Sequence, residues 1–237
     1  MKTIGLIGGM SWESSLEYYR IINEETKRRL GGLHSAKSLM YSVDFAEIEE
    51  LQHKGDWETA THMMIDAAKH LENGGADFVL ICTNTMHKMA KDVEKAIAIP
   101  LLHIADPTAE AIKAQGLTKV ALLGTKYTME QDFYKGRLIE KFGLDVITPN
   151  DTDRQTVHDI IYNELCLGEI KTQSKRHFVE IIKRLERDGA QGIILGCTEI
   201  GLLIKQADVS LPVFDTTQLH AEAAVAAANE KSVNLPV

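Results

Sequence analysis

This sequence of 237 residues lacks signals for membrane insertion and for secretion. Nowhere do about 18 apolar residues follow one another, as a membrane-spanning helix requires, and the apolar run at the N-terminus is short and broken by glycine. The three cysteines form no C-x-x-C pair, and any disulfide scheme leaves one of them unpaired. These absences predict a soluble, cytoplasmic protein with free thiols.

Positive charge is also scarce. The net charge is -8, and the longest basic cluster is Lys27–Arg29. Nucleic acids and anionic membranes are bound by basic surfaces, so neither is an expected partner. The nine histidines show no H-E-x-x-H spacing, which predicts no metal ion, and His87 is interpreted as a residue at the start of a helix. A small molecule is the expected partner.

The glycines near the N-terminus do not form a nucleotide-binding fingerprint. Gly5, Gly8 and Gly9 follow the first apolar residues, but their spacing does not fit G-x-G-x-x-G. We therefore expect no cofactor, and we interpret this turn as a place where the backbone approaches a small ligand.

Apolar runs alternate with amphipathic segments along the whole chain. The runs are continuous rather than alternating, as in parallel strands that helices cover on both faces. Between them lie helical patterns such as Trp57–Leu71, closed by the glycines that follow Asn73. This order predicts an α/β fold. The polar stretch that begins at Thr148 is interpreted as a long surface loop.

The two halves of the sequence resemble each other. Ile4–Met10 aligns with Val120–Lys126, the Gly-Ala pair at Gly75 aligns with that at Gly189, and all these matches have nearly the same spacing. Such a repeat predicts two pseudo-twofold-related, Rossmann-like lobes with parallel sheets. Because ligands in open α/β sheets bind beyond the carboxyl ends of the strands, the active site is expected in the cleft between the lobes.

The boundary between the lobes is expected to be discontinuous. Residues 99–106 and 211–217 are the corresponding late strands of the two halves. If the second of these strands crosses back, residues 1–98 and 211–237 form lobe 1, and residues 99–210 form lobe 2.

The repeat places Thr83 and Cys197 at nearly equivalent positions after a buried strand. Both turns are predicted to begin a helix, whose free N–H groups and dipole attract anions. The same field would lower the pKa of the Cys197 thiol from ~8.5 toward neutrality, which makes Cys197 a candidate base or nucleophile. Cys82 is expected to point away from the cleft and, like Cys166, to serve only in packing.

Four motifs together resemble the cofactor-independent aspartate/glutamate racemase family. They are Ile4–Asn23, Cys82–His87, Leu122–Tyr134 and Leu195–Ile200, and the resemblance runs essentially end to end. It implies a two-lobed enzyme that needs no pyridoxal phosphate and acts as a homodimer. In that family one cysteine from each lobe serves as a base or acid on opposite faces of the substrate Cα.

This chain departs from the family pattern at Thr83, where the first-lobe cysteine is expected. It thereby resembles a broad-specificity subgroup directed toward L-aspartate and L-glutamate. The resemblance implies that Cys197 removes the α-proton of the L-amino acid and that Thr83, or water beside it, returns a proton to the other face. A hydroxyl holds its proton more tightly than a thiol, so Thr83 is expected to be a poor base.

The resemblance also implies a set of substrate-binding residues: Met10, Gln52, Asn84, Thr85, Thr125, Thr198 and Glu199. Asn84, Thr85 and Thr198 are expected to hold the α-carboxylate, and Gln52 is expected to reach the distal carboxylate. No arginine or lysine stands at the matching positions for that distal group. Tolerance of both aspartate and glutamate is therefore expected.

Two other functions remain open from the sequence. Cofactor-free decarboxylases of substituted malonates belong to the same superfamily and use only the second-lobe cysteine. The hydroxyl of Thr83, where such decarboxylases have a small residue, favours racemisation. A non-catalytic, two-lobed amino-acid binder is the other possibility, although a reactive thiol would be unexpected in it.

Overall fold

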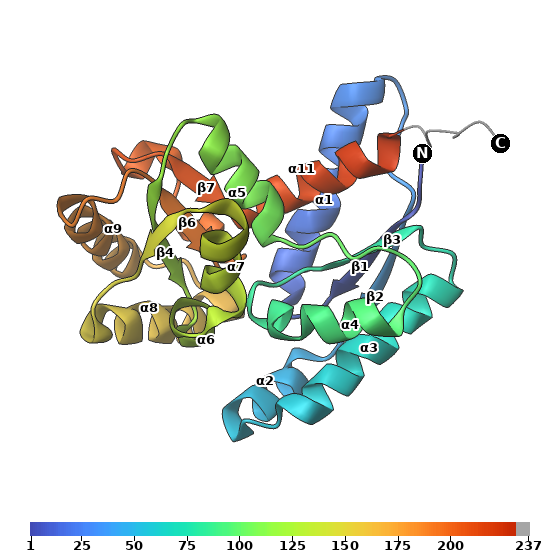
Figure 1. Cartoon of the computed structure of the whole chain (residues 1–237), viewed down its shortest axis with the longest axis horizontal. Coiled ribbons are helices and arrows are strands. Elements are labelled where there is room, and N and C mark those ends of the chain that lie inside the picture. Colours follow the sequence, from blue (N-terminus) through green and yellow to red (C-terminus); the bar gives the residue numbers. More distant parts are fainter. Residues whose placement is uncertain (231–237) are drawn as a thin grey trace.

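The computed structural model describes residues 1–230, which form two lobes side by side (Figure 1). The sheet of the first lobe contains three parallel strands in the order β2-β1-β3. These strands are β1 (Ile4–Gly8), β2 (Ser38–Ser42) and β3 (Phe78–Ile81). Leu101 adds a single parallel bridge to Val79, on the free side of β3.

The sheet of the second lobe repeats this order. Its parallel strands are β4 (Lys119–Gly124), β5 (Asp145–Ile147), β6 (Ile193–Gly196) and β7 (Val213–Asp215). They are arranged β5-β4-β6-β7, so β7 holds the place that the bridge at Leu101 holds in the first lobe. The predicted α/β fold with two parallel sheets is confirmed.

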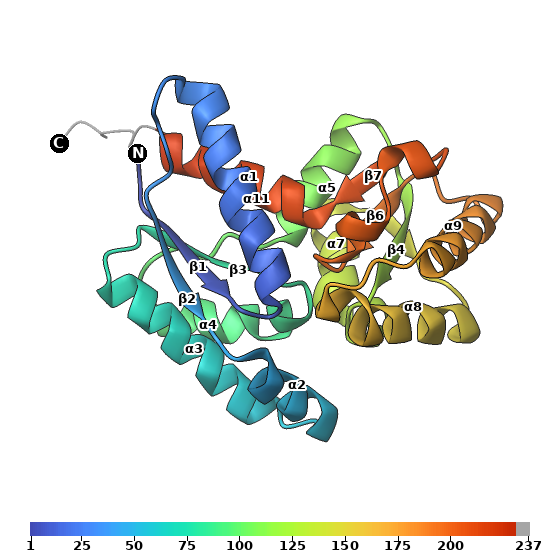
Figure 2. The same cartoon turned by 180° about the vertical axis from the view of Figure 1, so that it is seen from behind.

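Helices cover both faces of each sheet (Figures 1 and 2). Those between β1 and β4 are α1 (Trp12–Leu30), α2 (Phe45–Lys54), α3 (Trp57–Asn73), the 3-10 turn η1 (Thr85–Met89), α4 (Ala90–Ala96) and α5 (Ala105–Ala114). Those after β4 are α6 (Lys126–Glu130), α7 (Asp132–Phe142), α8 (Asp151–Asn163), η2 (Leu165–Leu167), α9 (Thr172–Arg187), α10 (Ile200–Leu203), η3 (Gln206–Asp208) and α11 (Thr216–Asn229). Among residues 1–230, none of these helices has the length and apolar character needed to cross a membrane.

Helix α3 shows how local sequence fixes these elements. The Asp56 side chain accepts a hydrogen bond from the Thr59 backbone N–H at 3.1 Å and so caps the first turn. Ala60, Met64 and Ala67 then recur at helical spacing and are fully buried against the first sheet. The helix predicted from Trp57 onward is therefore confirmed.

The predicted crossing of the last strand is wrong. Phe214 of β7 pairs with Ile194 of β6, so the strand stays in the second sheet. It is α11 that crosses back: its residues Ala221 and Val225 are buried in the same cluster as Ile22 of α1 (Figure 1). In the first lobe the Leu101 segment lies beside β3, and in the second lobe β7 lies at the matching place beside β6.

Two further segments lie elsewhere than expected. The segment around Leu101, assigned to lobe 2 from the sequence, bridges to the first sheet. The stretch from Thr148 is not a long loop, because α8 begins at Asp151 and the Asn150 side chain caps it by accepting from the Asp153 backbone N–H at 3.0 Å. The remaining lobe boundaries stay predictions.

Candidate active site

A narrow cavity lies between the lobes, beyond the carboxyl ends of the central strands. Its volume is about 20 Å³, enough for about one water molecule. All the residues predicted for the site line it, except Thr198: Met10, Gln52, Thr83, Asn84, Thr85, Thr125, Cys197 and Glu199. The structure thus brings together side chains from both halves of the repeat. Their individual roles stay predictions.

On the Cys197 side of the cavity, a buried carboxylate accepts hydrogen bonds from the side chains around it. Cys197 Sγ donates a hydrogen bond to Glu199 Oε2 at 2.9 Å, and Thr198 Oγ1 donates to the same oxygen at 2.8 Å. Ser11, at the start of α1 in the other lobe, donates to Glu199 Oε1 at 2.7 Å. Glu199 is only 2% exposed, and these three donors compensate its loss of water. Thr198 therefore faces Glu199 instead of the cavity.

The environment of Cys197 shifts its pKa in the direction opposite to our expectation. Burial and the neighbouring charge of Glu199 raise the pKa of the Cys197 thiol well above its ordinary value. The predicted helix field is weak here, because α10 spans only four residues and starts after Glu199. The expected lowering of this pKa is therefore wrong, and the resting thiol keeps its proton.

The Thr83 side of the cavity is held by a neutral histidine. His87 Nδ1 donates to the Thr83 carbonyl at 2.7 Å, and His87 Nε2 accepts from the Ile104 backbone N–H at 3.1 Å. These two bonds fix the tautomer, and burial lowers the pKa of His87 well below its usual range. His87 lies in η1, at the start of the helical segment as predicted. No carboxylate contacts the Thr83 hydroxyl within residues 1–230.

Asn84 presents a free acceptor to the cavity. Its Nδ2 donates to Thr216 Oγ1 at 3.0 Å, and Thr216 Oγ1 in turn donates to the Leu195 carbonyl at 2.8 Å. This chain of bonds fixes the orientation of the amide. Asn84 Oδ1 is consequently buried without a hydrogen-bond partner in the described chain.

Further polar contacts join the lobes around the cavity, besides the bond between Ser11 and Glu199. Thr85 Oγ1 and Thr125 Oγ1, from the corresponding turns of the repeat, lie 3.0 Å apart. The Tyr162 hydroxyl on α8 donates to Gln52 Oε1 on α2 at 2.8 Å. Gln52 Nε2 also donates to Met86 Sδ at 3.2 Å, so the whole amide is held in place.

Sequence reasoning missed several cavity residues: Phe45, Ile161, Tyr162, Cys166 and Gly196. Cys166 was interpreted as packing only, but its side chain lines the cavity, whereas Cys82 is buried in the core of the first lobe as predicted. The missed residues on α8 and η2 lie outside the repeated turns. The only sequence signal that links them is the spacing of four positions between Tyr162 and Cys166, which would place both on one helical face, and this signal is weak.

The cavity has a single carboxyl group. Glu199 is the only acidic side chain in the lining described, and no lysine or arginine lines it. Within residues 1–230 no three histidine, cysteine or acidic side chains gather where a metal ion could bind. The cavity thus has a thiol beside a carboxylate from one lobe and a hydroxyl from the other lobe.

The chain belongs to the Asp/Glu/hydantoin racemase family, whose sequence model matches residues 7–224. A broad-specificity amino-acid racemase of Bacillus subtilis, RacX, is 25% identical over 173 residues, which are 72% of this chain and 73% of that protein. The match to the family model extends across both lobes and includes the two turns that supply Thr83 and Cys197.

Solved structures agree with this assignment. A Yersinia pestis protein described as a candidate Asp/Glu racemase has 60% identity and a TM-score of 0.90, over 97% of this chain and all (100%) of that chain. An aspartate racemase homologue from Pyrococcus horikoshii has 40% identity and a TM-score of 0.83, with the same coverage of 97% and 100%.

Proposed function

We propose that this chain is a cofactor-independent racemase that interconverts the L- and D-forms of aspartate and glutamate. The observation that carries the proposal is the hydrogen bond from Cys197 Sγ to the buried Glu199, in a cavity whose other lobe supplies Thr83. Family membership supports racemisation, and the names of the relatives support amino acids as substrates.

Glu199 gives the protonated thiol a route to a thiolate. In the first step the Cys197 proton moves to Glu199 Oε2, which leaves a thiolate beside a neutral carboxyl group. The thiolate then takes the α-proton of the L-amino acid, and the electron pair left on Cα spreads into the α-carboxylate. Thr83, or a water molecule beside it, protonates the opposite face, and Thr83 recovers its proton from water. The hydroxide left by that water takes the proton from Glu199, which restores the resting carboxylate. Ser11 and Thr198 keep Glu199 oriented throughout.

The polar groups of the cavity suggest how the substrate lies. Asn84 Oδ1 is an unused acceptor, so it suits the α-ammonium group. The hydroxyls of Thr85 and Thr125 can donate to the α-carboxylate. This placement differs from the family-based expectation that Asn84 binds the carboxylate, because its Nδ2 already bonds Thr216.

Substrate access requires the lobes to separate. A cavity of about 20 Å³ is several times too small for a dicarboxylic amino acid. Opening would break the contacts of Ser11 with Glu199, of Thr85 with Thr125 and of Gln52 with Tyr162. When the lobes close over the substrate, Thr85 and Thr125 would donate to it instead of to each other. Closure then excludes water from the carbanion.

A substrate panel tests the proposal. Proton NMR in D₂O would follow L-aspartate, L-glutamate, neutral L-amino acids and substituted malonates with the purified protein. We expect loss of the Cα–H signal of aspartate and glutamate, together with appearance of the D-enantiomers. Release of CO₂ from a malonate would instead establish a decarboxylase, and binding without exchange or CO₂ release would establish a non-catalytic binder.

We also propose that the chain forms a homodimer through an apolar patch on its surface. The patch consists of five side chains, each more than half exposed: Trp12, Leu16, Tyr19, Leu167 and Ile170. The first three share one face of α1. The segment of Leu167 and Ile170 adjoins the start of α1, because a Cβ atom on Gly168 would stand 3.6 Å from Glu13 Oε1.

The size of the patch fits a second copy of the chain. Its side chains expose on the order of 500 Å². A standard interface buries about 800 Å² on each partner, of which about 65% is apolar in homodimers. The patch therefore supplies about the apolar area that one partner of a homodimer contributes.

Sedimentation velocity tests this interface. We expect the wild-type protein to sediment as a dimer and Leu16→Glu to sediment as a monomer, because the substitution places a charge in the centre of the patch. Leu33→Glu is the matched control, since Leu33 is fully exposed outside the patch and this variant should stay dimeric. A monomeric wild-type protein, or a dimeric Leu16→Glu variant, would contradict the proposal.

A further inference from the structure

A second cavity lies between the lobes and has no part in the proposed reaction. Its volume is about 440 Å³, far larger than the catalytic cavity. One wall comes from η1 and α4 of the first lobe and the other from α7 of the second lobe, and we call it the α4–α7 groove. It is lined by His87, Lys88, Ala90, Lys91, Glu94, His103, Asp132, Phe133, Gly136, Arg137, Glu140 and Lys141.

The floor of the α4–α7 groove offers an unused hydrogen-bond donor. His103 is only 4% exposed, and its Nδ1 accepts from the Ala105 backbone N–H at 3.2 Å. The proton of the neutral ring is therefore on Nε2, which has no partner within residues 1–230. His103 lines the groove, so this N–H is available to a ligand there.

The floor also has positive potential. Arg137 binds Asp106 through two hydrogen bonds of 2.5 and 2.7 Å, and Lys141 Nζ lies 2.8 Å from the same carboxylate. Two cations against one anion leave a net positive charge near His103. Burial and these cations lower the pKa of His103 to about 2, so its ring stays neutral and keeps a single donor. An oxyanion suits this floor.

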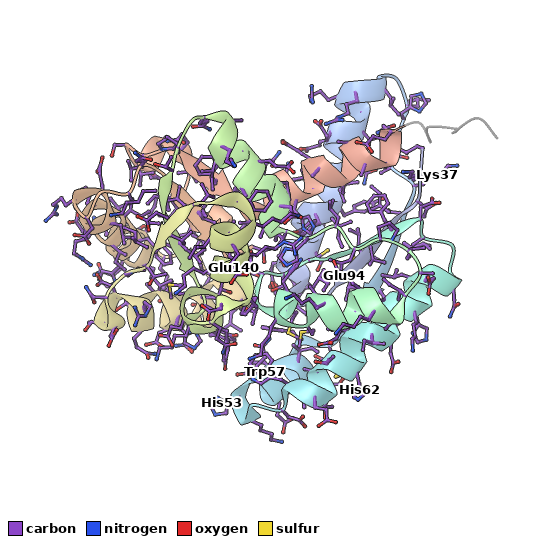
Figure 3. All side chains as sticks on the ribbon, in the orientation of Figure 1. Lys37, His53, Trp57, His62, Glu94 and Glu140 are labelled. Carbon is purple, nitrogen blue, oxygen red and sulfur yellow. The ribbon has the colours of Figure 1, made fainter. Side chains whose placement is uncertain are left out.

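The rim of the α4–α7 groove has the opposite character. Glu94 on α4 and Glu140 on α7 are exposed and form no ion pair in the described chain, and they lie on the two sides of the boundary between the lobes (Figure 3). Both glutamates line the same groove as Arg137 and His103. A cationic group of a ligand bound to the floor would be attracted to both of them.

We propose that the α4–α7 groove is a second binding site for a free α-amino acid, distinct from the catalytic cavity. The carboxylate of the ligand accepts from His103 Nε2–H near Arg137, and its ammonium group lies between Glu94 and Glu140. A ligand that carries one group of each sign at this short spacing matches the floor and the rim together.

Occupation of the groove would act on the catalytic cavity through the lobes. The ligand contacts α4 and α7, so it favours the arrangement in which the lobes are closed. His87 lines the groove and also holds the Thr83 carbonyl at 2.7 Å. The bound amino acid therefore stabilises the turn that carries Thr83, and the site is regulatory.

NMR of the histidine rings tests the site without any use of turnover. The probe is L-glutamate, added to protein with labelled histidines, and the His103 resonance is assigned from a His103→Gln variant. We expect a saturable shift of the His103 signal. In the double variant Glu94→Lys/Glu140→Lys the affinity seen at His103 should fall at least about tenfold, because two favourable charges are reversed.

Glu110→Lys is the matched control, since Glu110 is exposed on α5 and does not line the groove. Its titration should follow that of the wild-type protein. An unmoved His103 signal would overturn the proposal. So would an unchanged titration in the double variant, because the shift would then come from the catalytic cavity. Neither result depends on whether the protein is a racemase.

Discussion

The turns after β3 and after β6 occupy the same place in the two lobes but surround their polar residue differently. Beside Cys197 stands the carboxylate of Glu199, which accepts the thiol proton. Beside Thr83 stands the neutral His87, which donates to the Thr83 backbone carbonyl rather than contacting its hydroxyl. The duplication accounts for the matching positions of the two turns. In the proposed reaction, the side chains around each turn decide which one removes a proton.

The largest expected effect concerns the thiol itself. Cys197→Ser should lower the rate of α-proton exchange by about 10³-fold or more, since a serine hydroxyl is a poor base near neutral pH. Proton NMR in D₂O with L-glutamate measures the rate. Cys166→Ser makes the same change at the other cysteine of the cavity and should cost less than about tenfold. An equal loss in both variants would show that the base is misassigned.

The next largest effect concerns the carboxylate. Glu199→Gln keeps the shape of the side chain but cannot take the thiol proton, so exchange should fall by about 10²-fold. Ser11→Ala removes one of the donors to Glu199 and should cost less than about tenfold, because the carboxylate remains. The same assay compares both. A Glu199→Gln variant with nearly wild-type exchange would remove Glu199 from the proton path.

The histidines behind the Thr83 turn predict a smaller effect, on stability. Burial lowers the pKa of His220 to about 4. In the unfolded chain His220 takes up a proton near pH 6.5, whereas in the folded chain it does so only near pH 4. The contribution of His220 to the free energy of unfolding is therefore fully present above pH 6.5 and is lost as the pH falls toward 4. Between about pH 7 and pH 5, His220 should account for a loss of about 2 kcal/mol in the free energy of unfolding.

Urea unfolding at these two pH values checks this expectation. His220→Gln should reduce the loss on acidification by about that amount. His62→Gln is the control, because His62 lies on the exposed side of α3 (Figure 3) and should leave the loss unchanged. Identical pH dependence in all three proteins would show that His220 is protonated equally in the folded and unfolded states.

Much of this comparison could be predicted from the repeat. Continuous apolar runs predicted the parallel strands, and equivalent positions after those strands brought Thr83 and Cys197 into one cavity. Such local patterns predict the place of the site, because the carboxyl ends of buried parallel strands lie at a common edge of the sheet.

The missing parts depend on contacts that no local pattern encodes. Ser11 reaches Glu199 across 188 positions of sequence, and Tyr162 reaches Gln52 across 110. The raised pKa of Cys197 depends on burial by both lobes, which a helix-dipole argument ignores. The strand at Phe214 was misplaced because sequence similarity to the Leu101 segment does not tell which sheet each strand joins.

The most direct test of the account moves the thiol from the Cys197 turn to the Thr83 turn, because the account assigns the base to the turn that carries the thiol. Enantiomers have equal free energies, so kcat/KM for racemisation must be the same in both directions, and exchange of Cα–H with D₂O is the informative rate. We expect the double variant Thr83→Cys/Cys197→Ser to exchange D-glutamate at least about tenfold faster than L-glutamate, because its only thiol in that pair faces the other side of Cα. The wild-type protein should show the opposite preference. A folded double variant that still exchanges L-glutamate faster would contradict the account.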